Sequence, residues 1–178
     1  MRDVAVIGIG MTRFGKFLDK GIKDLVRESV EKAISDAGIT KKDIEAAYVG
    51  SGVPGVMTGQ EMIKAQVTLS AMGIEAIPMI NVENACASSS SALHLGWTAV
   101  AAGLYDCVLV AGFEKFYDKD KLKSYMALGS AVDIEVIVKI LEDFYQQKEN
   151  KKQIYFPQIY PGSPGSHQHY PGHGQGTP

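Results

Sequence analysis

The first 113 residues alternate between short apolar runs and longer segments with helical periodicity. The apolar runs, each typical of a buried parallel strand, lie at 4–7, 46–49, 77–82 and 107–111. Strands that alternate with helices favour a parallel sheet joined by right-handed crossovers. The sequence therefore predicts an α/β fold with a mostly parallel sheet.

Two segments between these runs predict helices that cover the sheet. Apolar residues recur at three- and four-residue steps from Ile22 to Ala37, with charged residues on the opposite face and Gly38 at the position of a C-cap. Residues 58–61 have the form of a capping box, and apolar residues then recur at helical spacing over 62–72. We expect an amphipathic outer helix in each place.

A third segment, 85–103, has a different pattern. It has small and apolar residues on every side, and no charged residue lies between Glu83 and Asp106. A helix without a polar face has to be buried all round. One sheet with one helix layer cannot bury it, so we expect this helix in a middle layer between two sheets.

The pattern loosens toward the C-terminus and predicts three parts. Residues 1–116 form the α/β core, and residues 117–160 form a second segment with one helix at 134–145 and a solvated charged loop at 118–123. Residues 161–178 are rich in Pro, Gly and His and contain no charged residue and no Leu, Ile, Val, Met or Phe. Such a composition cannot offset the entropy of ordering, so we expect this tail to be disordered.

Composition and charge exclude several classes of protein. Eighteen Lys and Arg against twenty Asp and Glu give a net charge of −2, which argues against a partner that is a nucleic acid or a membrane surface. The apolar stretch 92–105 is too short for a membrane span of about 20 residues. Two cysteines form neither a disulfide framework nor a metal site with zinc-finger spacing. With no signal-peptide pattern at the start, we expect a cytoplasmic chain with free thiols.

Cys86 is the residue that could perform chemistry. It lies just after a predicted strand and just before the apolar helix, where unpaired N–H groups and the helix dipole stabilise a thiolate. The same N–H groups could hold an oxyanion formed at an acyl carbon that the sulfur attacks. The alternative is that Cys86 is only a small buried apolar residue, which position alone favours.

Three segments resemble the thiolase superfamily and occur in the same order as in that family. Residues 84–88 (Asn-Ala-Cys-Ala-Ser) resemble its nucleophile turn, and the glycine-rich start at 4–15 is similar to that of the sterol-carrier-type thiolases and the archaeal acetyl-CoA acetyltransferases. Residues 110–115 resemble the strand end that follows the central helix. The resemblance implies the N-terminal half of a thiolase fold.

The resemblance also implies a function, an acyltransferase of lipid metabolism that acts on acyl-CoA thioesters. Cys86 would be the catalytic nucleophile that takes the acyl group from acyl-CoA, with its own N–H as one oxyanion donor. Claisen condensation or thiolytic cleavage by CoA would follow, with coenzyme A thioesters as substrates and no further cofactor. Ser89 departs from the family pattern, which usually has glycine three residues after the cysteine.

The catalytic histidines of the family belong to its second half, which this chain does not contain. We therefore expect the general base to be missing and turnover to be negligible. His94 lies eight residues after the cysteine on the helix and is expected to be a buried histidine, and Cys107 is expected in the core. The tail histidines, His167, His169 and His173, are explained by composition or by a weak metal-binding tract.

Three alternatives stay open on the sequence. The chain could be a non-catalytic thiolase half acting as a partner subunit, because its central helix would leave an exposed apolar patch that drives homo-oligomer formation or association with a complementing subunit. Family dimers pair the strand that here spans 77–82 across their two-fold axis. A β-ketoacyl-synthase-like condensing protein has a similar cysteine turn but places it further along the chain. A dinucleotide site at Gly8 and Gly10 is disfavoured, because Arg13 breaks the fingerprint.

Overall fold

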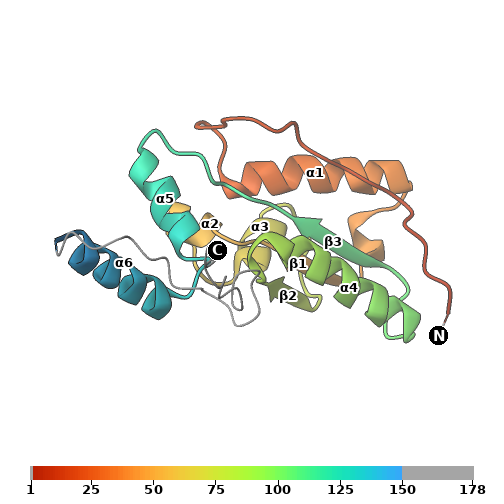
Figure 1. Cartoon of the computed structure of the whole chain (residues 1–178). Coiled ribbons are helices and arrows are strands. Elements are labelled where there is room, and N and C mark those ends of the chain that lie inside the picture. The colour runs from red at the N-terminus through yellow and green to blue at the C-terminus, as the bar shows by residue number, and fades with distance from the viewer. Residues whose placement is uncertain (1, 150–178) are drawn as a thin grey trace, which may run out of the picture. The chain divides into compact units, whose positions relative to one another are not determined.

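The computed structural model describes residues 2–149 and divides the chain into two compact units, Met1–Ala131 and Val132–Pro178. The first unit contains the sheet and the helices that cover it (Figure 1). The expected disordered tail at 161–178 and the end of the 117–160 segment lie outside the described residues. The expected domain boundaries at 116 and 160 remain predictions.

A parallel sheet of three strands forms the centre of the first unit. Its strands are β1 (Ala46–Gly50), β2 (Met79–Val82) and β3 (Val108–Gly112), in the order β2-β1-β3. Every residue of the central strand β1 is buried, as two covered faces require. The structure confirms the parallel α/β fold and three of the four expected strands.

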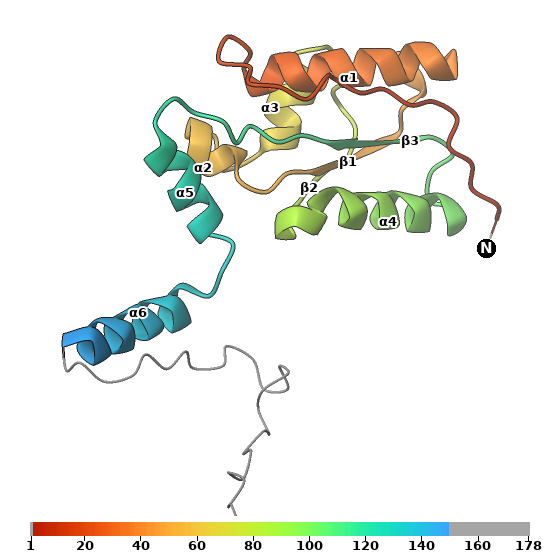
Figure 2. The same cartoon turned by 45° about the horizontal axis from the view of Figure 1, so that its top comes forward.

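Helices α1 (Ile22–Ala37) and α3 (Lys64–Ser70) cover one face of the sheet, and Figure 2 shows α4 (Ser88–Ala101) on the other face. Successive strand residues point to opposite faces, so each strand contributes to two separate cores. The core beneath α1 and α3 is the larger one, and it is formed by Val26, Val30, Ile44, Ala47, Val49, Ala65, Leu69, Met72, Ile74, Leu109 and Ala111. This face confirms the amphipathic outer helix expected at 22–37.

The central apolar segment folds as a short 3₁₀ turn, η2 (Ala85–Ala87), followed by α4 (Ser88–Ala101). Its small residues Ala92, Gly96 and Ala99 are buried against the sheet. Its opposite face is exposed, with relative exposures of 54%, 41% and 45% for the large residues Leu93, Leu95 and Trp97. Burial on all sides is therefore wrong for this chain, because one sheet covers only one face of the helix. The exposed apolar surface is what the partner-subunit alternative requires.

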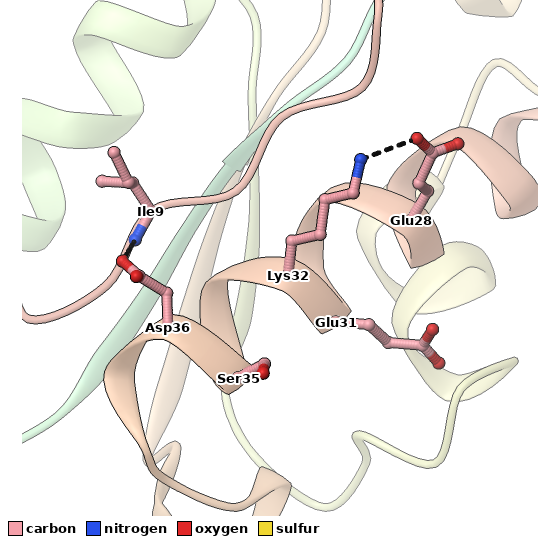
Figure 3. A pocket seen from close by; sticks show the side chains of 6 residues that line it. All are labelled: Ile9, Glu28, Glu31, Lys32, Ser35 and Asp36. Carbon is pink, nitrogen blue, oxygen red and sulfur yellow. Dashed lines mark hydrogen bonds and ion pairs between the residues drawn. The ribbon is translucent and has the colours of Figure 1, made fainter.

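The N-terminal segment is not a strand, and the prediction for 4–7 is wrong. Arg2 donates a hydrogen bond to the Val100 carbonyl at 2.6 Å, and the Ile9 N–H donates to Asp36 of α1 at 2.9 Å. Figure 3 shows this contact beside the Lys32–Glu28 ion pair, which spans 2.9 Å. The segment passes from the end of α4 to α1 without ladder bonds, and its hydrogen bonds at Arg2 and Ile9 are made to those helices. A short apolar run cannot distinguish such an extended crossing from a paired strand.

The other elements correct two further predictions. The expected capping box at 58–61 is absent, because Thr58 ends the short helix α2 (Pro54–Thr58) and its hydroxyl donates to the Pro54 carbonyl at 2.6 Å. The expected loop at 118–123 contains the start of α5 (Lys121–Gly129), which is capped by Asp120.

Three smaller points complete the description of the chain. A 3₁₀ turn, η1 (Lys41–Asp43), precedes β1. In the second unit α6 (Ile134–Glu149) confirms the expected helix at 134–145. Within residues 2–149 every helix is too short or too polar to serve as a membrane span.

Candidate functional site

The candidate site lies where the three parallel strands end. The chain leaves β1 into Ser51 and Gly52, leaves β2 into the turn 84–88, and leaves β3 into Glu114. Open parallel sheets place ligand sites at the carboxyl ends of their strands, where the following loops converge. These three segments lie at the same edge of the sheet because the three strands are parallel.

Ser88 fixes the shape of the turn 84–88. Its hydroxyl accepts a hydrogen bond from the Asn84 N–H at 2.8 Å and donates one to the Ala85 carbonyl at 2.7 Å. The Ala87 N–H closes the turn by donating to the Asn84 carbonyl at 2.8 Å. Ser88 is buried, and it holds Ala85 in the left-handed region at a φ of 44°, which costs an alanine about 1–2 kcal/mol. The turn is therefore firmly held.

Cys86 lies in the middle of this turn, on the 3₁₀ segment that precedes α4. Its side chain is exposed rather than buried in the core. The neighbouring N–H groups of Asn84, Ala85, Ala87 and Ser88 all have acceptors, whereas the N–H of Cys86 donates to no acceptor within residues 2–149. The expected position, just before the apolar helix, is confirmed. The sulfur and one free N–H donor are both available to a reagent.

Two glycines allow the start of α4 to lie directly on the strand ends. Gly50 and Gly112 are register partners at the last positions of β1 and β3. A Cβ atom at Gly50 would lie 2.6 Å from the Ser88 carbonyl carbon, and one at Gly112 would lie 3.0 Å from the Ser89 Cβ and closer still to its hydroxyl. Any larger residue would push the helix start away from the sheet.

The serine at position 89 replaces the glycine that the family usually has. Its hydroxyl occupies the space above Gly112 that an additional Cβ would need. The extra hydroxymethyl group is therefore accommodated on the strand-end side, at the junction with β3.

Glu114 joins the ends of β3 and β1. Its two carboxylate oxygens accept hydrogen bonds from the Gly52 and Val53 N–H groups, each at 3.1 Å. Loss of water around the carboxylate raises the pKa of Glu114, although these N–H donors and the nearby charge of the buried Lys64 oppose the rise. Sequence reasoning placed Glu114 in a family-like segment without assigning it a role.

The other candidate groups do not meet at Cys86. The exposed His94 lies eight residues further along the helix, about 12 Å of rise, so the expectation that it is buried is wrong. Cys107 is half-buried just before β3, at the opposite end of that strand, and burial raises the pKa of its thiol, helped by the nearby Asp43 and Glu45. The described residues contain no cluster of three or more His, Cys, Asp or Glu side chains that could hold a metal ion.

Two cavities lie near the sheet, and Cys86 lines neither. One, of about 750 Å³, is largely apolar and lies between the N-terminal segment, β3 and the α4 residues Leu93 and Trp97. The other, of about 610 Å³, is an open depression on α1 (Figure 3). There the Asp36 carboxylate accepts from the Ile9 N–H, and the Lys32 ammonium is paired with Glu28. The chemistry at Cys86 is therefore open to the surface.

Comparison with known proteins assigns the family. Residues 4–150 match the family described as "Thiolase, N-terminal domain", so the chain belongs to the thiolase family through its N-terminal domain. An "Acetyl-CoA acetyltransferase" of Methanothermobacter thermautotrophicus is 38% identical over 160 residues, which are 90% of this chain and 38% of that protein. The protein of that name in Methanocaldococcus jannaschii is 43% identical over 135 residues, 76% of this chain and 34% of its own length.

A further curated protein and a solved structure are also similar to part of this chain. A "Sterol carrier protein 2" of Gallus gallus is 40% identical over 116 residues, covering 64% of this chain and 20% of its own length. The crystal structure of 3-oxoacyl-[acyl-carrier-protein] synthase III from Aquifex aeolicus VF5 aligns with 48% of this chain and 27% of its own at 13% identity, with a TM-score of 0.42. The resemblance to sterol-carrier-type and archaeal thiolases is confirmed. The chain spans well under half the length of the relatives it matches.

Sequence reasoning found Cys86 but missed the residues that hold its turn. Ser88 gave no distinct signal, because it is one serine in a run of four. The sequence did contain a pattern that could have identified Gly50 and Gly112, since each follows an apolar run that predicts a parallel strand. A glycine at that place on two neighbouring strands indicates close approach of another backbone.

We expect Gly112→Ala to lower the free energy of unfolding by about 1–3 kcal/mol, because its Cβ would overlap Ser89. Adding Ser89→Gly should restore most of the loss, since it removes the overlapping atoms. The measurement is urea unfolding of the single and double variants.

Two controls accompany this experiment. Gly50→Ala would meet the backbone of Ser88, so Ser89→Gly should not rescue it, and Gly129→Ala has open space and should leave stability equal or slightly higher. Equal stability of Gly112→Ala and the unaltered chain would contradict the close contact between α4 and β3.

Proposed function

We propose that this chain provides the acyl-accepting half of a thiolase-type acyltransferase acting on acyl-CoA thioesters, with Cys86 as the nucleophile. One observation supports the proposal most directly: the exposed Cys86 sulfur lies in a turn held by Ser88, with an unpaired N–H on the same residue. Membership of the thiolase family and the activity named for the two archaeal relatives support the substrate class.

The proposed step transfers an acyl group from coenzyme A to the cysteine. The Cys86 thiolate forms a bond to the thioester carbonyl carbon, and the Cys86 N–H donates to the resulting oxyanion. The carbon–sulfur bond to coenzyme A then breaks, and the departing thiolate takes up the proton that Cys86 released. Coenzyme A and an acyl-cysteine are the products, with no change of oxidation state.

Completion of a catalytic cycle needs a group that moves protons for the second substrate. His94 is the sole histidine within residues 2–149, and it lies about 12 Å along the helix from the nucleophile. We therefore propose that the described residues support acylation of Cys86 but not rapid Claisen condensation or thiolysis. A general base supplied from outside residues 2–149 would complete the cycle.

Incubation of the purified chain with acetyl-CoA tests this proposal. We expect one acetyl group per chain on Cys86, because its thiol is exposed beside a free N–H donor. Intact-mass analysis and peptide mapping measure the modification. Cys86→Ala should abolish it, whereas Cys107→Ala is the matched control and should not change it.

Two outcomes would alter the proposal. Absence of any acetyl group on Cys86 in the folded chain would leave the cysteine as a structural residue and contradict the proposed function. Steady thiolysis of acetoacetyl-CoA that is lost in Cys86→Ala would show that no further base is required.

A second candidate function, a partner subunit, is favoured by the exposed apolar face of α4. Leu93, Leu95 and Trp97 of α4 are exposed, and Leu93 and Trp97 also line the apolar cavity beside the N-terminal segment and β3. Exposed apolar side chains next to an apolar cavity mark an interaction site or drive association. We propose that a second copy or a complementing chain covers this face. The outer edge of β2, which is also unpaired in the described sheet, is a further contact for a homodimer.

We expect the chain to associate at micromolar concentration, because burying these side chains releases about 25 cal/mol per Å² of apolar surface. Leu93→Gln with Trp97→Gln should shift the population toward monomer in light scattering. Met62→Gln, which also removes an exposed apolar side chain, is the control and should leave association unchanged. A monomer in the unaltered chain under the same conditions would contradict this candidate.

A further inference from the structure

We infer that Glu114 is a positioning residue for Cys86, acting through the loop that follows β1. This inference rests on the proposed function, since it concerns how the nucleophile turn is held in the geometry that acyl transfer needs. Glu114 itself does not touch the reacting atoms. It acts on the 51–53 loop, and that loop lies against the turn.

The contacts form a continuous path from Glu114 to the nucleophile turn. Both carboxylate oxygens of Glu114 are used, one by the Gly52 N–H and one by the Val53 N–H. The position that a Cβ would take at Gly52 lies 3.0 Å from a Glu114 carboxylate oxygen and 3.4 Å from the Ala85 carbonyl oxygen. Gly52 is therefore bonded to Glu114, and a single methyl group added to it would reach the carbonyl oxygen of Ala85, the residue that precedes Cys86.

The last ladder bonds of the sheet hold only the beginning of this loop, at Gly50 and Ser51. The Ser51 N–H donates to the Val82 carbonyl of β2, and the Phe113 N–H donates to the Gly50 carbonyl of β1, each at 3.1 Å. Beyond Ser51 the sheet offers no further partner, and Glu114 satisfies the next two N–H groups. Without it, Gly52 and Val53 would be free to move away from Ala85.

A carboxylate is needed because two donors point at it. An ionised carboxylate accepts at both oxygens, whereas an amide has one acceptor and one donor. In Glu114→Gln one of the two N–H groups would face an NH₂ group and lose its bond. Lys64, buried at the start of α3, places a positive charge near Glu114 and favours the ionised form.

The chain contains a matched control at the opposite end of the sheet. The Glu45 carboxylate accepts from the N–H groups of Asp106 and Cys107, just before β3 begins. Both bonds at Glu45 go to one oxygen, Oε2, whereas Glu114 uses both of its oxygens. Glu45→Gln can therefore keep both bonds through its amide oxygen, and it is the control for the same change of charge away from the nucleophile turn.

The test compares Glu114→Gln and Glu45→Gln in two measurements on the full chain. The first is the rate of Cys86 acetylation at increasing acetyl-CoA concentration, followed by intact mass, with circular dichroism to confirm that both variants fold. The second is amide hydrogen exchange of the 50–54 and 84–89 peptides, which needs no activity.

We expect Glu114→Gln to lower the limiting rate of acetylation by about tenfold, because a misplaced reacting group slows the chemical step. The half-saturating acetyl-CoA concentration should stay within about twofold, since a positioning residue outside the substrate contact affects the step more than binding. Exchange in the 84–89 peptide should rise. In Glu45→Gln these quantities should match the unaltered chain, because the remaining amide oxygen can accept from both N–H groups.

The outcomes separate this inference from the proposed function. If the unaltered chain takes no acetyl group, the proposed function fails, and the exchange measurement still decides whether Glu114 holds the turn. Unchanged exchange at 84–89 in Glu114→Gln would overturn the inference. So would an equal change of acetylation in both variants, which would show a general loss of stability.

Discussion

The contact between the start of α4 and two paired glycines is the constraint on which the site depends. Gly50 and Gly112 face each other across the ends of β1 and β3. The backbone of Ser88 and Ser89 lies against Gly50, and the Ser89 side chain lies against Gly112. This contact fixes where the helix begins. The turn that carries Cys86 must then form immediately before it, at the edge of the sheet.

Hydrogen bonds within the turn explain why it tolerates a strained residue. Ala85 has a positive φ but, unlike glycine, carries a side chain that makes this conformation unfavourable. The surrounding hydrogen bonds must therefore outweigh the conformational free energy that it costs. Ser88 supplies two of these bonds, and Glu83 supplies another by accepting from the Ala85 N–H at 2.6 Å. The result is an exposed cysteine whose neighbours are fixed and whose own N–H is unpaired. Held strain of this kind is typical of functional turns.

α4 has one covered and one exposed side because the described chain has one sheet. Small residues allow the helix to approach β1 and β3 closely, whereas its large apolar residues Leu93, Leu95 and Trp97 remain exposed. A helix whose sequence lacks a polar face is suited to a second covering layer. The exposed side therefore connects the composition of the helix to the proposal that another chain or copy covers it.

Much of the fold could be predicted from the sequence, because periodicity identified the strands at 46–49, 77–82 and 107–111 and the helix at 22–37. The run at 4–7 has an equally apolar pattern but no ladder partner, and pairing is a tertiary property that a local pattern does not contain. Cys86 could be predicted from the family-like segment around it. Ser88, Gly52 and Glu114 could not, since their roles depend on which loops the strand order brings together.

The relative reactivity of the two cysteines tests most directly whether the fold leaves the Cys86 thiol exposed to reagents. The measurement is the rate of alkylation of Cys86 and Cys107 by iodoacetamide in the folded chain and in urea. The account predicts that folded Cys86 reacts about tenfold or more faster than Cys107, whose thiol is half-buried with a raised pKa, and that the rates converge in urea. Equal or slower reaction of Cys86 in the folded chain would contradict it.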